Sequence, residues 1–358
     1  MGNSGSKIQK VRVTAGKLLK ICFLMLSLLK FNEDSVLGQI GGNGTYQFLD
    51  LTNSAKIAAL GGTQISLTDN DVALPFYNPS LLSDSMKNQI TVNYASYIAG
   101  IGVGYAAYAP NIRGRNNFAA GIHFVNYGTF DGASETGQVT GTFKAAEYSI
   151  NLFFSRELIS GLRIGVNLKP IFSSFESYSS YGLAADLGII YSSISKRTSV
   201  SIVSRNMGSQ ITTYYPGGVR ENLPWDLLLG FSRHLTNAPV NFLVTADHLN
   251  LWDLGYTDPA TSQFPSSSSR ENFSTKLISH LIFGIEFSPE QHLTLRLGYN
   301  YQRRKELSVE SHPGLVGYSA GIGVKIAKFN INYGIASFHL AATVHYLSLT
   351  TSLSEFIH

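Results

Sequence analysis

Apolar and polar side chains alternate along most of this chain. In the stretch 292–303, Leu293, Leu295 and Leu297 share one parity, and the residues between them are polar. Because successive side chains of a β-strand point to opposite faces, the alternation predicts strands with one apolar and one polar wall. Strands of soluble domains usually have about five or six residues, whereas a tilted strand that crosses a bilayer needs about 9–11. The long alternating stretches therefore predict a membrane barrel.

The predicted fold class is all-β, an outer-membrane antiparallel β-barrel of about fourteen strands, with a partly helical N-terminal segment that plugs the barrel or caps its inner end. The predicted strands span 88–98, 100–109, 116–126, 145–156, 161–174, 181–192, 197–206, 225–235, 239–249, 278–288, 292–303, 316–327, 329–337 and 339–350.

The lengths of the predicted connections sort by parity along the chain. Six connections that share one side of the barrel are short: 111–115, 157–160, 193–196, 236–238, 289–291 and 327–328. The opposite side carries the long connections 127–144, 207–224, 250–277 and 304–315. Outer-membrane barrels have short periplasmic turns and longer outer loops, so we expect both termini on the periplasmic side.

The composition agrees with a barrel. Charged residues make up 14% of the chain, and the chain contains 19 Tyr, 21 Phe and 34 Gly. No apolar run approaches the roughly 18 residues that a membrane-spanning helix needs. The formal net charge of +4 comes without a Lys/Arg cluster or an RNA-binding motif, so we expect no nucleic-acid partner.

The first 38 residues predict a signal peptide. A basic region reaches Lys20, the apolar stretch 21–29 follows, and Gly38 is a small residue before a cut at Gln39. A membrane anchor, an N-myristoylation site and a lipoprotein site at Cys22 are the weaker alternatives. Cys22 is the single cysteine, so removal of the signal would leave a chain without disulfides or thiol chemistry.

Residues 39–87 differ from the barrel that is predicted for 88–358. The stretch 49–60 has a helix-like pattern that Gly61 and Gly62 stop. A candidate turn motif follows, formed by Asp71, Asn78 and Pro79. We expect this segment to lie outside the main sheet.

Candidate catalytic and metal-binding groups are scarce. The His residues show no tight metal-ligand spacing, and we expect neither an enzyme nor a cofactor. His339 and His345 are interpreted as lumen side chains, and Asp247 and His248 as neighbours on opposite faces of one strand. Charges of both signs are predicted in the lumen: Lys169, Asp186, Arg205, Asp247, Glu286, Arg296 and Lys325.

The ordered set Gly44–Leu51, Ala55–Gly62, Asp69–Asp71 and Phe76–Leu82 resembles the N-terminal region of the PorV/PorQ family of the Bacteroidetes type IX secretion system. That group is distantly similar to the FadL-type long-chain fatty-acid transporters. The resemblance implies a non-enzymatic anchor in an attachment complex. Its partners would be a PorZ-like surface protein, PorU/PorV-like components and outer-membrane lipopolysaccharide. In that complex secreted cargo is joined to anionic lipopolysaccharide.

Two other functions stay open at this point. A FadL-like transporter of long-chain fatty acids or other hydrophobic molecules would need an apolar lumen pocket and a lateral opening, for which Lys169-Pro170 offers a strand kink. A general porin would need an unobstructed lumen, which a plug at 39–87 would fill.

Overall fold

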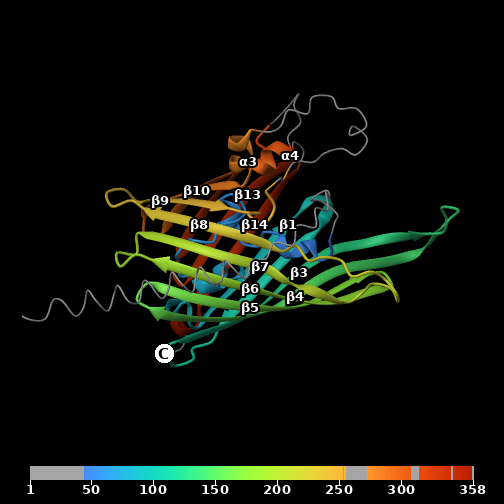
Figure 1. Ribbon diagram of the computed structural model, residues 1–358, viewed down its shortest axis with the longest axis horizontal. Helices are drawn as coiled ribbons and strands as arrows, with labels where there is room; N and C mark the ends of the chain where they lie inside the picture. The colour runs from blue at the N-terminus through green and yellow to red at the C-terminus, as the bar shows by residue number, and fades with distance from the viewer. Residues whose placement is uncertain (1–43, 253, 255–271, 308–313, 340–341, 357–358) are drawn as a thin grey trace, which may run out of the picture. The chain divides into compact units, whose positions relative to one another are not determined.

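The computed structural model describes residues 44–252, 254, 272–307, 314–339 and 342–356. Within them, fourteen antiparallel strands close into one barrel, in which each strand pairs with its neighbours in sequence and β1 pairs with β14 (Figure 1). The strands are β1 (Gln89–Ser96), β2 (Gly102–Ala109), β3 (Asn116–Ala133), β4 (Val139–Ile159), β5 (Leu162–Phe175), β6 (Tyr178–Ser192), β7 (Thr198–Thr212), β8 (Asp226–His234), β9 (Val240–Ala246), β10 (Leu281–Glu290), β11 (Leu293–Asn300), β12 (Tyr318–Ile326), β13 (Phe329–His339) and β14 (Ala342–Ser352).

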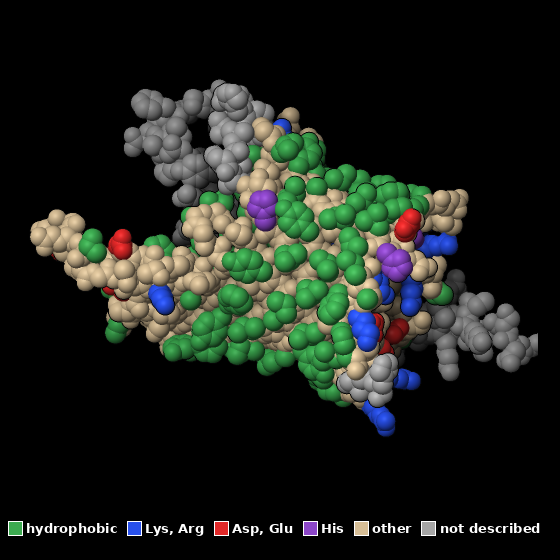
Figure 2. Space-filling model, turned by 180° about the vertical axis from the view of Figure 1, so that it is seen from behind, with side chains coloured by type: hydrophobic (Ala, Val, Ile, Leu, Met, Phe, Trp, Pro, Cys, Tyr) green, Lys and Arg blue, Asp and Glu red, His purple; other side chains and the backbone are tan. Residues whose placement is uncertain are grey.

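The apolar wall of each strand faces outward. In β11, Leu295 and Leu297 are 42% and 61% exposed, whereas Arg296 between them and Gly298 after them are buried in the lumen. Figure 2 shows hydrophobic side chains spread over the outside of the barrel, with Lys, Arg, Asp and Glu gathered mainly at one end. This inversion of the usual burial pattern is what a barrel in lipid requires.

The connections divide between two ends of the barrel. Six short turns lie at one end, here called the turn end: 110–115, 160–161, 193–197, 235–239, 291–292 and 327–328. The other end, the loop end, carries the connections 213–225, 247–280 and 301–317 with helices α3 (Phe273–Ser279) and α4 (Tyr301–Leu307). The six predicted short turns are confirmed.

Two predicted boundaries at the loop end are wrong. The expected loop 127–144 is mostly strand, because β3 and β4 continue beyond the rest of the wall and turn only at 134–138. The predicted strand 292–303 ends at Asn300, where α4 begins, and α3 occupies the expected loop just before β10. No helix among the described residues is long and apolar enough to cross a membrane.

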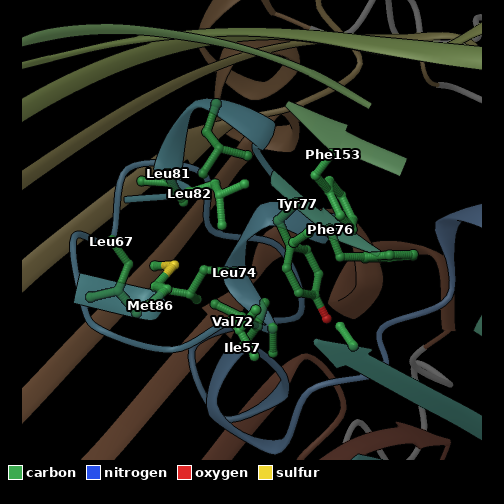
Figure 3. Packing of buried hydrophobic residues seen from close by; sticks show 14 of the residues in the cluster. Ile57, Leu67, Val72, Leu74, Phe76, Tyr77, Leu81, Leu82, Met86 and Phe153 are labelled. Carbon is green, nitrogen blue, oxygen red and sulfur yellow. The ribbon is translucent and has the colours of Figure 1, made fainter. Parts of the chain in front are cut away.

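Residues 44–88, here called the lumen segment, lie inside the barrel. Its short elements are the 3-10 helices η1 (Gln47–Asp50), η2 (Leu74–Phe76), η3 (Pro79–Leu81) and η4 (Asp84–Met86) and the α-helix α2 (Ala55–Ala58). The predicted helix 49–60 is therefore broken into two single turns, and Gly61 and Gly62 stop the second one with φ of +101° each. Figure 3 shows apolar side chains of this segment packed together, with Phe153 of β4 beside Phe76. The predicted signal peptide, residues 1–38, lies outside the described residues.

Candidate functional site

The lumen segment runs the length of the barrel. It begins at the loop end, where Gly44 bridges to Asn222 and the amide of Thr45 donates to the Asn222 carbonyl at 3.0 Å. It ends at the turn end, where the Asn88 amide donates to the Ala109 carbonyl at 2.7 Å. Among the described residues, the backbone of the segment forms hydrogen bonds with the backbone of the barrel only at these two ends. The segment can therefore shift without breaking a sheet ladder.

Between its ends, the segment is held by side chains of the wall. Hydroxyl groups of five strands bond to its backbone: Ser155 to the Leu82 carbonyl (2.5 Å), Ser201 to the Ile65 carbonyl (2.9 Å), Ser232 to the Ser66 carbonyl (2.8 Å), Ser319 to the Gly61 amide (3.0 Å) and Ser348 to the Ala55 amide (2.9 Å). Each of these bonds satisfies a buried backbone group that the sheet does not pair.

Glycines of the wall make room for this segment. A Cβ atom on Gly298 would lie 2.1 Å from the Gly61 nitrogen, and one on Gly165 would lie 2.2 Å from the Pro79 carbonyl carbon. Lumen-facing glycines with such close approaches, all under 3.3 Å, occur on seven strands: Gly165, Gly188, Gly230, Gly284, Gly298, Gly321 and Gly334. A side chain at these positions would displace the segment.

The three residues of the predicted turn motif all lie in the lumen segment, but only Asn78 and Pro79 form a turn. The side-chain Nδ2 of Asn78 donates to the Ile65 carbonyl at 2.7 Å. Its Oδ1 accepts from the backbone amide of Ser80 at 3.0 Å, and this bond caps η3. Pro79 is the first residue of that helix, where its missing amide hydrogen leaves no partner unsatisfied. Asp71 lies apart from this turn, in an ion cluster.

The ion cluster consists of Lys56, Asp69 and Asp71. The buried Lys56 ammonium contacts the carboxylates of Asp69 and Asp71, the latter at 3.0 Å. Burial alone would lower the pKa of Lys56, but the two carboxylates outweigh it and hold this pKa above its usual value. The Lys56 charge lowers the pKa of Asp69 to about 2. The cluster ties α2 to the loop that follows it, so it fixes the shape of the lumen segment.

A second polar network joins the lumen segment to the wall. Lys169 of β5 pairs with Asp186 of β6 at 2.7 Å, and both side chains are almost fully buried. Asn206 of β7 accepts from Lys169 and donates to Asp50 of η1, which also pairs with Arg205 at 3.3 Å. The β4–β5 ladder lacks pairs between 149/171 and 152/168, next to Pro170, whereas β5 keeps its pairs with β6 through Pro170.

A cavity of about 710 Å³ opens at the loop end. It is lined by the start of the lumen segment and by side chains of the surrounding strands and loops: Gly44, Thr45, Tyr46, Gln47, Tyr127, Glu147, Phe175, Tyr178, Tyr214, Tyr215 and Glu221. The Tyr127 hydroxyl donates to Glu147 at 2.6 Å. We call this the aromatic cavity. Its size is in the range of ligand pockets, about 300–1,000 Å³.

A smaller cavity of about 260 Å³ lies at the turn end and is polar throughout. Asp69 of the lumen segment and Arg296 of β11 are among the side chains that line it, together with Lys196, Arg197, His234 and Glu286. The residues between the two cavities are buried almost continuously from Phe48 to Leu67. The lumen segment therefore separates an aromatic cavity at the loop end from a charged cavity at the turn end.

Several predicted lumen residues are placed as expected, and others are not. Lys169, Asp186, Arg205, Glu286 and Arg296 face inward and form ion pairs. Lys325 is exposed near the turn end. The prediction for His345 is wrong: its side chain faces outward and its Nδ1 lies 2.7 Å from the Tyr333 hydroxyl.

The prediction for Asp247 and His248 is wrong too, since the His248 Nδ1 lies 3.4 Å from the Asp247 carboxylate. The strand ends at Ala246, and His248 has a φ of +52°, so alternation no longer applies there. Within the described ranges, no group of three or more His, Cys, Asp or Glu side chains is arranged to hold a metal ion.

The sequence reasoning missed the aromatic cavity. Inward parity in β3, β4 and β5 is a signal for Tyr127, Glu147 and Phe175, because they share the parity of their buried neighbours. Parity does not show how far along the barrel axis a side chain lies. The cavity forms because these three side chains lie at the same position along that axis.

No family model and no curated protein matches this chain. Solved structures do match it. A crystal structure of the Pseudomonas putida toluene transporter TodX aligns with 85% of this chain and 99% of its own, at 14% identity and a TM-score of 0.51. This chain shares its fold with that transporter. A second TodX structure gives 12% identity, 84% and 96% coverage and a TM-score of 0.50. A Pseudomonas aeruginosa FadL homologue aligns at 11% identity, 84% and 98% coverage and a TM-score of 0.47.

Proposed function

We propose that this protein is an integral outer-membrane channel that admits small hydrophobic molecules at the loop end and releases them at the turn end. The observation that carries the proposal is the aromatic cavity, whose floor is the start of the lumen segment. A molecule bound there touches the segment that obstructs the lumen. The shared fold with a toluene transporter supports the proposal, although fold alone does not assign a substrate.

Passage requires the lumen segment to shift. Its middle is held by side-chain contacts, and its backbone joins the barrel only at the two ends of the described segment. Such contacts can exchange one partner for another while the barrel wall stays closed. A bound molecule that displaces Tyr46 or Gln47 would act on the segment at its attachment point beside Asn222.

The test is saturable binding of an apolar fluorescent naphthalene probe to the purified full chain in detergent, with toluene and a long-chain fatty acid as competitors. Tyr127→Ala and Tyr214→Ala remove cavity rings, and we expect each to weaken binding about ten-fold. Tyr191→Ala is the matched control, since Tyr191 faces outward and is 51% exposed. Binding that does not saturate, or that falls equally in the control, would overturn the proposal.

A second function follows from the family resemblance, namely anchoring of a PorZ-like surface protein and of PorU/PorV-like components. The observation that favours it is the exposure of apolar side chains on three loop-end connections: Val219 (87%), Phe273 (68%) and Leu315 (73%). Exposed apolar groups on loops are common contacts for partners. Affinity purification of the tagged protein tests this role. We expect Phe273→Ser to reduce the recovery of partners, and Phe118→Ser, on the outer face of β3, is the control that should not. Recovery of the protein without such partners would count against it.

A further inference from the structure

Three of the rings that line the aromatic cavity contact one another in series. The centroids of Tyr127 and Phe175 are 5.6 Å apart, and those of Phe175 and Tyr214 are 5.9 Å apart. Six of the eleven lining residues are aromatic. The face of an aromatic ring carries negative partial charge, so a ring face that a ligand can reach attracts cations and disfavours anions.

Hydrogen bonds fix these rings in place. The Tyr214 hydroxyl lies 2.7 Å from the Ser173 hydroxyl, and the Tyr46 hydroxyl lies 2.5 Å from that of Ser180. Gln210 donates to Ser180 at 2.9 Å and accepts from the Glu221 amide at 3.0 Å. The cavity wall is therefore organised before a ligand arrives, which lowers the entropic cost of binding.

The formal charges on the cavity lining are all negative. Glu147 and Glu221 are its carboxylates, and no Lys or Arg is among the lining residues that the structure describes. The nearby Lys169 and Arg205 are paired with Asp186, Asp50 and Asp226 below the cavity. Glu147 is only 4% exposed and accepts from Tyr127, so it is a fixed acceptor at the cavity surface.

We infer that the aromatic cavity selects hydrophobic organic cations, that is, molecules with an apolar or aromatic body and an ammonium group, over carboxylates of the same size. The ring faces would hold the ammonium by cation–π attraction, and Glu147 and Glu221 would add charge pairing. A fatty-acid carboxylate would meet two carboxylates and no cation. The inference rests on the proposed channel function and names its substrate class.

The test compares three probes that share a ring and a chain length: phenylbutylamine, phenylbutanol and phenylbutyrate. Calorimetric titration of the purified full chain in detergent at neutral pH measures each Kd, with empty micelles as the blank. We expect the amine to bind about ten-fold more tightly than the alcohol, and the carboxylate to bind more weakly than both.

Glu147→Gln and Glu221→Gln remove the charges while keeping the shape of the side chains. We expect Glu147→Gln to weaken amine binding about ten-fold and to leave alcohol binding unchanged. Glu135→Gln, at the exposed tip of the β3–β4 hairpin and outside the cavity, is the matched control and should change neither.

The outcomes separate the inference from the function beneath it. If the alcohol binds as tightly as the amine, or the carboxylate binds best, the channel proposal stands and the cation selectivity is wrong. An amine preference that persists in both glutamine variants would also overturn the assignment to these carboxylates. Failure of all three probes to bind saturably would count against the channel function itself.

Discussion

Gly298 of β11 and Gly61 of the lumen segment lie in direct contact, so close that a Cβ on Gly298 would stand 2.1 Å from the Gly61 nitrogen. The contact repeats around the barrel at the other lumen-facing glycines. The wall and the segment therefore pack closely because glycines of the wall have no side chain. Adding a side chain at one of these glycines is the most direct way to separate them.

Gly298→Val is expected to push the lumen segment aside at a cost of about 1–3 kcal/mol, because overpacking a filled interior forces shifts of this order. Planar-bilayer recordings should show a higher conductance, and limited proteolysis should cut the segment faster. Leu297→Val is the control, since Leu297 faces outward and is 61% exposed. Unchanged conductance in Gly298→Val would contradict the fit that the glycines imply.

Lys56→Met leaves Asp69 and Asp71 without their cation. Removing one partner of a buried ion pair costs about 3–5 kcal/mol, and Asp71 is the buried partner here. We expect the lumen segment to loosen, with faster proteolysis and more frequent channel openings. The double variant Lys56→Met with Asp71→Asn should recover much of the loss, because it removes the uncompensated charge. No difference between the single and double variants would refute this reasoning.

Asn78→Ala removes both the cap of η3 and the bond to the Ile65 carbonyl. We expect a loss of about 1–2 kcal/mol in the stability of the lumen segment, because the buried Ser80 amide loses its partner and the Ile65 carbonyl keeps only the bond from Ser201. Hydrogen exchange of residues 64–82 measures this loss. Asn70→Ala is the matched control, since Asn70 is exposed, and exchange there should stay close to that of the unsubstituted protein.

The environment of His248 predicts that the stability of the folded protein falls at alkaline pH. Burial lowers its pKa, but the hydrogen bond and charge of Asp247, with the charges of Asp226 and Asp50, outweigh it and raise the pKa to about 9. A raised pKa stabilises the folded state fully below the usual value of 6.5, and this contribution is lost as the pH rises through about 9.

The melting temperature of the loop end, followed by Trp fluorescence, should therefore fall between these two pH values. His248→Asn should abolish that part of the slope, whereas His234→Asn at the turn end should preserve it. A slope that is identical in His248→Asn would show that other groups cause it.

The sequence predicted the number and order of the strands because the alternation in each one is long. All fourteen predicted strands overlap the observed ones, including 329–337 against Phe329–His339. Alternation also predicted inward charges such as Lys169 and Asp186. The rule depends only on neighbours within one strand, so it works without knowledge of the closed barrel.

The errors arose where one strand is not enough. Whether 127–144 forms a loop or a hairpin depends on pairing between β3 and β4, which continues to the Gly132–Gly141 pair. The error for His345 has another cause: this residue shares the parity of the outward-facing Leu347 and Leu349, so the alternation within β14 itself places it on the outside. The aromatic cavity combines residues from the lumen segment, four strands and a loop, which no local pattern relates.

The lumen segment runs straight into β1, and the ring is sealed when β1 pairs with β14, joining Gln89 to Ser352. These two strands are the farthest apart in the chain, so we expect their seam to form last during assembly. Until then, the segment lacks some of the hydroxyl groups that bond to it and some of the glycines against which it packs, because strands from β4 to β14 supply them. Ordering of the segment and sealing of the ring therefore become one cooperative event, and a late insertion intermediate would contain an open sheet with its own N-terminal residues still unplaced.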